Sequence, residues 1–395
     1  MFPRRAQPFW QLEFTGAKSI ARLGSMEGLA RSITVSTVPL IAFDALGSKR
    51  AVSLTYLAGA AMALTFTLNV ATFERIMMRK WITTMGLVFL IASGLLFMIV
   101  DGPLFAVAVG FQSTATALFS VSLSLYTMDY IAKKDLVRAE STRMVYNGGA
   151  WLIGPTAGIW LWETGGRVAP FILSCFMAAA ALAYFWALRL GNNPVLEPRK
   201  TAATSPLKNI PRFFKQKHLR IAYAITTVRA LFWVAIFIYG PLYVVEAGLP
   251  TWASGVFLSS VASLLFFSPL VGRISTRHGT RAIVIVAFGI IGLGMVALAA
   301  LGSPRPIGLA CWIGAAVGAS WLDVVGNVPF MRTVKPRERV PMTTVFATWR
   351  EASYLITPGL AALVLSFAPF WVFYLCLAAL SFLTATAATY LPRRL

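Results

Sequence analysis

Long apolar blocks, each about as long as a bilayer is thick, alternate along the chain with short polar segments. A helix needs roughly 20 apolar residues to cross a hydrocarbon core of about 30 Å. Only helices and closed barrels satisfy all of their backbone groups in lipid. Runs such as 82–100 and 282–301 lack the period-two alternation of barrel strands. The pattern therefore predicts membrane-spanning α-helices.

Twelve such segments can be marked, and a polar stretch divides them into two sets of six. They lie near residues 18–46, 51–72, 82–100, 103–131, 143–163, 168–190, 219–246, 251–272, 282–301, 306–331, 342–366 and 369–390. The polar stretch, 191–218, is rich in proline and basic residues, and we expect a linker with a short amphipathic helix on the membrane surface around Arg212 to Lys217. We predict an all-α membrane protein with an N-terminal segment (1–17), two six-helix bundles (18–190 and 219–390) and a tail (391–395).

The two halves share short sequence matches at a nearly constant spacing. Three matched pairs lie about 202 residues apart: Pro39 and Pro241, Pro155 and Pro358, and Arg75 and Arg277. Duplicated helical units are typical of alternating-access carriers, whose binding site lies between the repeats. The sequence therefore indicates two related bundles with a central site.

Composition and charge argue against a soluble protein and against a nucleic-acid-binding protein. The chain is 58% hydrophobic and 12% charged, compared with about 45–50% and about 25% in soluble domains. Its net charge of +21 comes mostly from short segments between the apolar blocks, not from one surface or a separate domain. Because basic loops stay on the cytoplasmic side, we expect both termini to be cytoplasmic and the chain to lie in a bacterial inner membrane.

Several chemistries lack the residues they need. Cys175, Cys311 and Cys376 lie inside apolar blocks, and the histidines, His218 and His278, lie in loops, so we expect no metal site. There is no phosphate-binding glycine loop with a lysine and no nucleophile–base set. The first apolar block has no cleavage pattern, and we expect no removable signal peptide. We therefore expect neither a cofactor nor an enzymatic activity.

The loop after the eighth segment resembles the signature motif of the major facilitator superfamily. In that family a glycine and an acidic residue precede Arg, Gly and Arg between helices two and three, and again between helices eight and nine. The second copy in this chain retains Gly272, Arg277, Gly279 and Arg281, with Thr276 in place of the acidic residue.

The first copy of the motif is less complete, because Glu74, Arg75 and Arg79 are present but both glycines are absent. The resemblance covers nearly the whole chain. It implies the family's fold and alternating access, with these loops as a cytoplasmic latch in which basic residues pair with acids and helix ends. Charge that only sets membrane topology would explain the arginines nearly as well.

The fifth segment contains an element similar to one that is common in the family's antiporters, Gly154-Pro155-x-x-Gly158. The two glycines are about one turn apart and allow close helix approach, while Pro155 lacks a backbone donor and permits a kink. Uptake carriers have similar elements, so this favours export only slightly. The arginine that proton-coupled drug exporters carry in helix four is missing, and Gln112 is the polar residue there.

Ionisable residues inside spanning segments are costly and by default mark a functional pathway. Six of them lie on segments that the resemblance places beside a central cavity: Glu27 and Arg31 in the first, Arg229 in the seventh, Asp323 in the tenth, and Arg350 and Glu351 in the eleventh. Segments three, six, nine and twelve are nearly free of charge at mid-depth. This partition supports the family's fold.

The arginines among these residues predict a site for an anionic or zwitterionic solute. A guanidinium offers a fixed fork of donors that matches carboxylate or phosphate. The residues we expect to bind substrate are Arg31, Arg229, Arg350, Asn147, Gln112 and Trp349. The alternative is internal pairing with the acids, which would serve only to neutralise and pack.

The acids on the same segments are candidates for proton coupling: Glu27, Asp323 and Glu351. We predict a monomeric secondary transporter of a small organic solute, whose partners are lipid, the solute and protons. An alternative is efflux of hydrophobic drug-like compounds. Alternatives of other classes are a non-transporting receptor or assembly factor on the same fold, and an enzyme acting within the bilayer.

Overall fold

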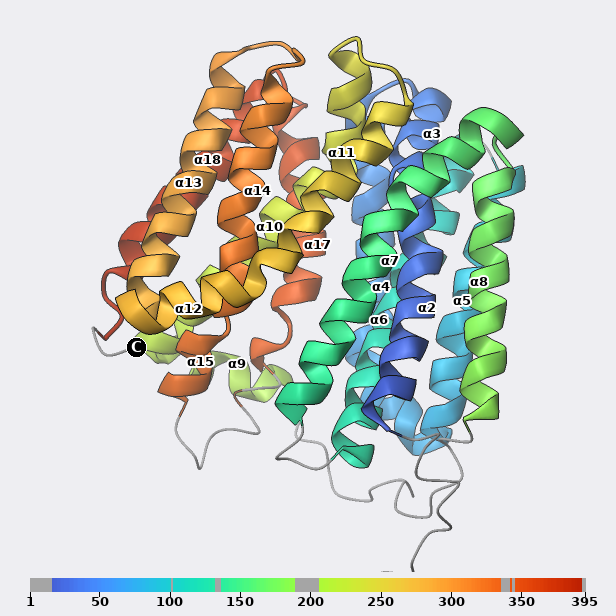
Figure 1. The fold of residues 1–395 in the computed structure, drawn as a ribbon, viewed down its shortest axis with the longest axis horizontal. Coiled ribbons are helices and arrows are strands. Elements are labelled where there is room, and N and C mark those ends of the chain that lie inside the picture. Colours follow the sequence, from blue (N-terminus) through green and yellow to red (C-terminus); the bar gives the residue numbers. More distant parts are fainter. Residues whose placement is uncertain are drawn as a thin grey trace, which may run out of the picture. The chain divides into compact units, whose positions relative to one another are not determined.

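A computed structural model describes residues 16–100, 102–131, 136–188, 206–334, 342 and 345–392, and none of these residues forms a strand (Figure 1). Eight stretches among them are long and apolar enough to cross a membrane: Lys18–Leu46, Arg79–Ile99, Gly102–Ser124, Ala169–Ala187, Lys217–Glu246, Thr280–Ala300, Gly308–Thr333 and Trp371–Ala388. The other four predicted segments overlap α4 (Lys49–Ile76), α7 (Leu136–Gly165), α11 (Trp252–Ser263) with α12 (Ser268–His278), and α17 (Trp349–Val364). The all-α membrane fold is confirmed, and the elements are consistent with twelve spans.

Internal contacts group the chain into two compact units. The first unit comprises residues 1–34 and 62–201, and the second comprises residues 35–61 and 202–395. The predicted bundles, 18–190 and 219–390, differ from these units in the segment 35–61, which groups with the second unit. Helix α4 therefore begins in one unit and ends in the other.

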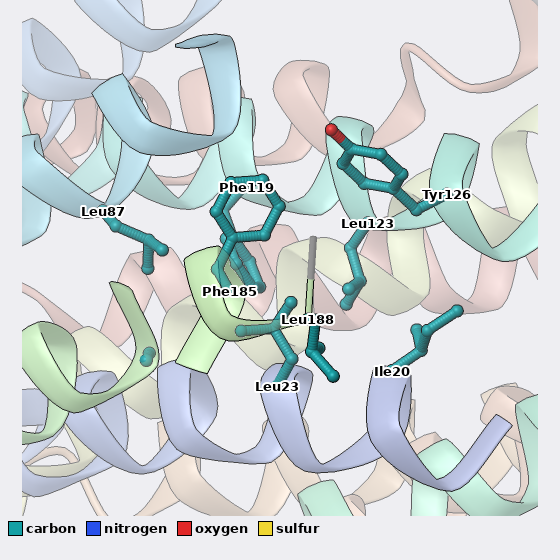
Figure 2. Packing of buried hydrophobic residues seen from close by; sticks show 9 residues of the cluster. Ile20, Leu23, Leu87, Phe119, Leu123, Tyr126, Phe185 and Leu188 are labelled. Carbon is teal, nitrogen blue, oxygen red and sulfur yellow. The ribbon is translucent and has the colours of Figure 1, made fainter. Parts of the chain in front are cut away.

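The first unit contains α2 (Ala17–Val35), the second half of α4, α5 (Arg79–Ile99), α6 (Phe105–Tyr130), α7 and α8 (Ala169–Ala187). Helix α5 lies against both α6 and α8. Figure 2 shows one hydrophobic core of this unit. It is formed by Ile20, Leu23, Leu87, Phe119, Leu123, Tyr126, Ala181, Phe185 and Leu188. In lipid such a core stabilises mainly through close packing, because the surrounding tails are as apolar as the side chains. The core fixes α2, which carries the first candidate residues, against α5, α6 and α8.

The second unit is built around one long helix, α10 (Lys217–Glu246), most of whose residues are buried. Its other helical elements are α3 (Thr37–Leu46), α9 (Pro206–Lys215), α11, η4 (Leu264–Phe267), α12, α13 (Thr280–Ala300), α14 (Gly308–Val325), α15 (Val328–Thr333), α17 and α18 (Trp371–Ala388). Helix α10 contacts α3, α9, α11, α14, α15, α17 and α18. A charged side chain on α10 is therefore surrounded by neighbouring helices.

A short helix, α9, is present where the sequence predicts an amphipathic one, and it ends at Lys215. Phe213 of α9 is fully buried against the start of α10 and against the aromatic rings of Phe330 and Phe346. These two rings are stacked, with centroids 3.9 Å apart. The adjacent Phe214 is exposed. The helix thus anchors the described end of the linker to the second unit.

Several of the predicted continuous segments contain a break in the α-helix. The first breaks at Ser36 before α3, the eighth passes through η4, and the tenth breaks at Gly326 before α15. A proline lies in the first turn after each of these breaks: Pro39, Pro269 and Pro329. Proline has no N–H to donate and is tolerated best in the first turn, so it favours a new helix start over an uninterrupted span.

Candidate functional site

Glu27 and Arg31 lie one turn apart on α2 and form a close ion pair. Nε of Arg31 is 2.6 Å from Oε1 of Glu27, and Nη2 is 3.4 Å from Oε2. The carboxylate therefore lies beside the Nε–Nη2 edge of the guanidinium, where Nη2 donates the hydrogen bond and the short Nε contact is an ion pair without hydrogen-bond geometry. Glu27 is only 5% exposed, and the Arg31 side chain is 22% exposed. Removing a pair of charges from water costs free energy unless the two groups neutralise each other in close contact.

Helix α7 contributes two side chains next to this pair. The guanidinium carbon of Arg31 is 5.6 Å from the ring centroid of Trp151, within range of a cation–π interaction. One turn earlier on α7, the Oδ1 atom of Asn147 occupies the space that a Cβ atom would fill at Gly28. The predicted residues Arg31 and Asn147 are thus brought together. Trp151 belongs to the same site and was missed by the sequence analysis.

Helix α6 reaches the same region of α2 through Gln112. Its Nε2 donates a hydrogen bond to Oγ1 of Thr34 at 3.0 Å, about one turn beyond Arg31. The structure thus places Gln112 next to α2, in contact with a threonine that was not predicted.

The approach of α7 to α2 depends on two glycines. A Cβ atom at Gly154 would overlap Ser32, and a Cβ atom at Gly158 would overlap the carbonyl of Ile33. Ser32 Oγ donates to a backbone oxygen of α7 at 2.9 Å across this contact. Pro155 lies between the two glycines, inside the helix. The Gly154-Pro155-x-x-Gly158 element therefore lets the backbones of α2 and α7 pack in direct contact near Arg31.

In the second unit, Arg229 lies inside α10 and is 5% exposed. Its Nη1 atom is 3.3 Å from Oδ1 of Asp323 and donates a hydrogen bond to the carbonyl of Leu322 at 3.2 Å. Within the described part of the chain its Nε is buried and has no hydrogen-bond partner. An unpaired buried donor costs about 1–3 kcal/mol. Arg229 therefore retains a buried donor whose hydrogen bond is unused in this conformation.

Trp349, at the start of α17, lies between two arginines. Its ring centroid is 5.1 Å from the guanidinium carbon of Arg229 and 5.7 Å from that of Arg350. Arg350 is exposed, whereas Glu351 is partly buried in the first turn of α17. The predicted residues Arg229, Asp323, Trp349 and Arg350 thus form one cluster.

One arginine–tryptophan contact of the first unit recurs in the second unit at the same chain spacing. Trp151 follows Arg31, and Trp349 follows Arg229, by 120 residues each, so both members recur after 198 residues. The paired prolines recur after about 202 residues. The offset of the arginine–tryptophan contact is therefore four residues shorter, which is about one helical turn. Both members of the second pair therefore lie about one turn nearer the N-terminal ends of their helices. This shared shift could have identified Trp151 from the sequence.

Part of the predicted latch lies outside what the structure describes, namely the side chains of Glu74 and Arg75 and the surroundings of Gly272. In the first copy, the guanidinium carbon of Arg79 is 5.6 Å from the ring centroid of Tyr126. This contact joins α5 to α6.

In the second copy, Gly279 separates α12 from α13 with φ 81°, a conformation that favours glycine. Arg277 is in the last turn of α12, where a cation interacts favourably with the helix dipole. Nη1 of Arg281 donates to the carbonyl of Leu391 at 3.2 Å. This arginine therefore holds the chain that follows α18.

The segment 35–61 is attached to the second unit by polar contacts that the sequence did not indicate. Nζ of Lys49 is 2.5 Å from Oε2 of Glu246 and 4.3 Å from the ring centroid of Phe370. One turn further along α4, Ser53 Oγ and Tyr239 Oη are 2.7 Å apart and share a buried hydrogen bond. These contacts fix the start of α4 to the C-terminal half of α10.

The membrane-length helices of the described residues define a polytopic membrane protein. The profile of the Major Facilitator Superfamily matches residues 23–304. This chain belongs to that superfamily. A comparison with curated proteins gives no match.

Solved structures with the same fold are transporters. The nucleoside transporter NupG superposes with a TM-score of 0.71 at 13% identity, covering 95% of this chain and 99% of that one. A POT family transporter in complex with 5-aminolevulinic acid gives 0.76 at 12% identity, with 93% and 94% coverage. A bacterial homologue of the iron transporter ferroportin gives 0.69 at 15% identity, with 97% and 99% coverage. Identities this low establish the fold alone.

Proposed function

We propose that this protein is a secondary transporter of a small anionic or zwitterionic organic solute, coupled to protons and working by alternating access. The observation that carries the proposal is the recurrence of one arrangement in both units. In each unit an arginine inside a spanning helix contacts a tryptophan and an acid: Arg31 with Trp151 and Glu27, and Arg229 with Trp349 and Asp323. Ionisable side chains within spans are costly and are typically kept for function.

Competition for the guanidinium groups supplies a coupling mechanism. Glu27 and Asp323 each form an ion pair with an arginine. When an anionic solute takes the place of the carboxylate at the arginine, the released acid becomes available to a proton. Solute and proton then enter the same state of the carrier. Glu351, beside Arg350, is the further candidate for this role.

The remaining expectations follow from the same proposal. Alternating access would proceed by rocking of the two bundles around the central site, with the Arg79 and Arg281 loops as its cytoplasmic latch. We propose that the chain acts as a monomer in a bacterial inner membrane, with both termini in the cytoplasm.

Transport by the purified chain in proteoliposomes tests the proposal. A first panel contains small organic acids and amino acids. It also contains the solutes named for its structural neighbours, which are nucleosides, peptides, 5-aminolevulinic acid and iron. Thermal stabilisation by a panel member reports binding by mass action and selects solutes for the transport assay.

Site variants connect any transport to the proposed residues. Arg31→Ala and Arg229→Ala should abolish solute exchange, whereas Arg305→Ala, which removes an exposed arginine, should leave it unchanged. Normal transport by both site variants would refute the anion site.

Efflux of hydrophobic compounds is a second candidate, favoured by the Gly154-Pro155-x-x-Gly158 element. Deletion of the gene should then increase sensitivity to hydrophobic toxins, whereas loss of an anion carrier should leave that sensitivity unchanged. A receptor or assembly factor on the same fold would exchange no solute in proteoliposomes, although it would still bind its ligand.

A further inference from the structure

Arg31 and Arg229 differ at one edge of the guanidinium. In Arg31 the edge formed by Nε and Nη2 lies beside both oxygens of Glu27: Nε forms a 2.6 Å ion pair that lacks hydrogen-bond geometry, and Nη2 donates a hydrogen bond at 3.4 Å. In Arg229 the polar contacts recorded among the described residues all fall on Nη1, while Nε is buried without a partner. The edge that the protein fills in the first unit is therefore open in the second.

The sequence explains this difference. Glu27 precedes Arg31 by four residues and so lies on the same face of its helix. The residue four positions before Arg229 is Ile225, which is fully buried and has no acceptor. The acid of the second unit, Asp323, comes instead from α14 and approaches the end of the guanidinium rather than its side. No carboxylate of α10 can occupy the open edge.

The contact with Trp349 leaves the Nε–Nη2 edge of Arg229 free to donate hydrogen bonds. Trp349 lies over the guanidinium of Arg229, with the ring centroid 5.1 Å from Cζ. The hydrogen bonds of a guanidinium run in its own plane, so a ring on its face uses none of the five N–H donors. The ring instead limits the tilt of the group and orients the Nε–Nη2 edge for an acceptor with two oxygens.

We propose that this open edge of Arg229 is the receptor for a carboxylate of the transported solute, in the place that Glu27 takes on Arg31. This proposal rests on the transport function proposed above and identifies the chemical group that its site recognises. The group that lies beside the corresponding edge of Arg31 is itself a carboxylate, that of Glu27. A phosphate monoester carries about −1.5 to −2 charges, which Asp323 on the same guanidinium would repel more strongly. Nε of Arg229 is shielded from solvent in this conformation. The carboxylate therefore enters in another conformation of the protein, in which the site is open.

Two variants at residue 225 test the open edge without any ligand. Ile225→Glu copies the spacing of Glu27 and Arg31 and should place a carboxylate on the edge. Ile225→Gln has nearly the same shape but no charge. We expect the Glu variant to unfold several degrees above the Gln variant in detergent, because its charge is matched by Arg229. If the edge were already satisfied, the additional buried charge would make the Glu variant the less stable of the two.

Matched solute pairs test recognition of the carboxylate. The probes are nicotinate with nicotinamide, benzoate with benzamide, and pyruvate with pyruvamide, with inorganic phosphate as a separate arm. In the unmodified protein at least one acid should raise the unfolding temperature more than its amide does. Ile225→Glu should abolish this difference, Ile225→Gln should retain it, and Arg229→Lys, which keeps the charge but lacks the planar fork, should lose it.

The outcomes separate this proposal from the transport function. Equal effects of acids and amides, a larger effect of phosphate, or a more stable Gln variant would each overturn the carboxylate receptor. If the acids bind as expected but cross no proteoliposome membrane, the receptor holds and the transport function fails. Exchange of a solute that has no carboxylate, unaffected by Ile225→Glu, would uphold transport and reject the receptor.

Discussion

Glu27 holds Arg31 by both of its carboxylate oxygens, so the first charged pair of the chain is already complete within one turn of α2. This pairing neutralises two charges inside a spanning helix. It also fixes the arginine beneath the Trp151 ring.

Replacing Glu27 by Gln should destabilise the protein, because Arg31 keeps its charge and loses the carboxylate on its edge. We expect a loss of about 1–3 kcal/mol, the usual cost of a buried group left without its partner. Thermal unfolding in detergent measures the loss. Adding Arg31→Gln to Glu27→Gln should recover part of it, and a double variant as unstable as the sum of the single variants would contradict the pairing.

Gly158→Ala should separate α2 from α7, because the added Cβ would overlap the Ile33 carbonyl and neither backbone can yield locally. Overpacking of this kind costs about 1–3 kcal/mol. Gly149 provides the control on the same helix, since a Cβ atom there meets nothing within 4 Å. Gly149→Ala should therefore be neutral or stabilising. Equal unfolding temperatures for the two variants would show that the helices are not in contact at Gly158.

Lys49 and Glu246 should show energetic coupling in a double-mutant cycle. Their atoms are 2.5 Å apart and both side chains are mostly buried, at 11% and 25% exposure. We expect a coupling energy of about 1 kcal/mol from unfolding measurements on the single and double Ala variants. Arg50 is exposed and adjacent in sequence, so the cycle of Arg50 with Glu246 is the control. Coupling as large for Arg50 would mean that the charges interact without a specific pair.

Trp349→Leu should weaken the second-unit site more than Trp349→Phe does. Phenylalanine retains an aromatic face for Arg229 and Arg350, whereas leucine has none. The loss expected for a desolvated cation–π contact is about 2 kcal/mol, read as a change in unfolding free energy. Trp371→Leu, at a more exposed tryptophan, should have little effect. Identical results for the Phe and Leu variants would exclude the aromatic contact as the stabilising term.

The sequence predicted the fold well because bilayer-length apolar blocks constrain the chain strongly. The helix breaks at Ser36 and Gly326 were missed, since hydropathy averages over a proline whose backbone effect is local. Internal pairing, which the sequence analysis gave as the alternative to solute binding, is observed for Glu27 and Arg31, whose helical spacing is fixed.

Pairing between helices was harder to predict. That Arg229 uses Nη1 for Asp323 and leaves Nε unpaired depends on the angle at which α14 passes α10, which no residue pattern encodes. Lys49 and Glu246 are almost 200 residues apart in the chain, and their contact follows from the grouping of 35–61 with the second unit. Both features required coordinates.

The contact of Gly158 with Ile33 has a consequence for how the first unit would move. Because the backbones of α2 and α7 are in direct contact, the two helices have no room to slide past each other. They would therefore move together as one rigid body in any conformational cycle. Arg31 and Trp151, fixed to those two helices, would then keep their mutual distance throughout. Release of a solute bound beside Arg31 would therefore require a rearrangement elsewhere in the molecule.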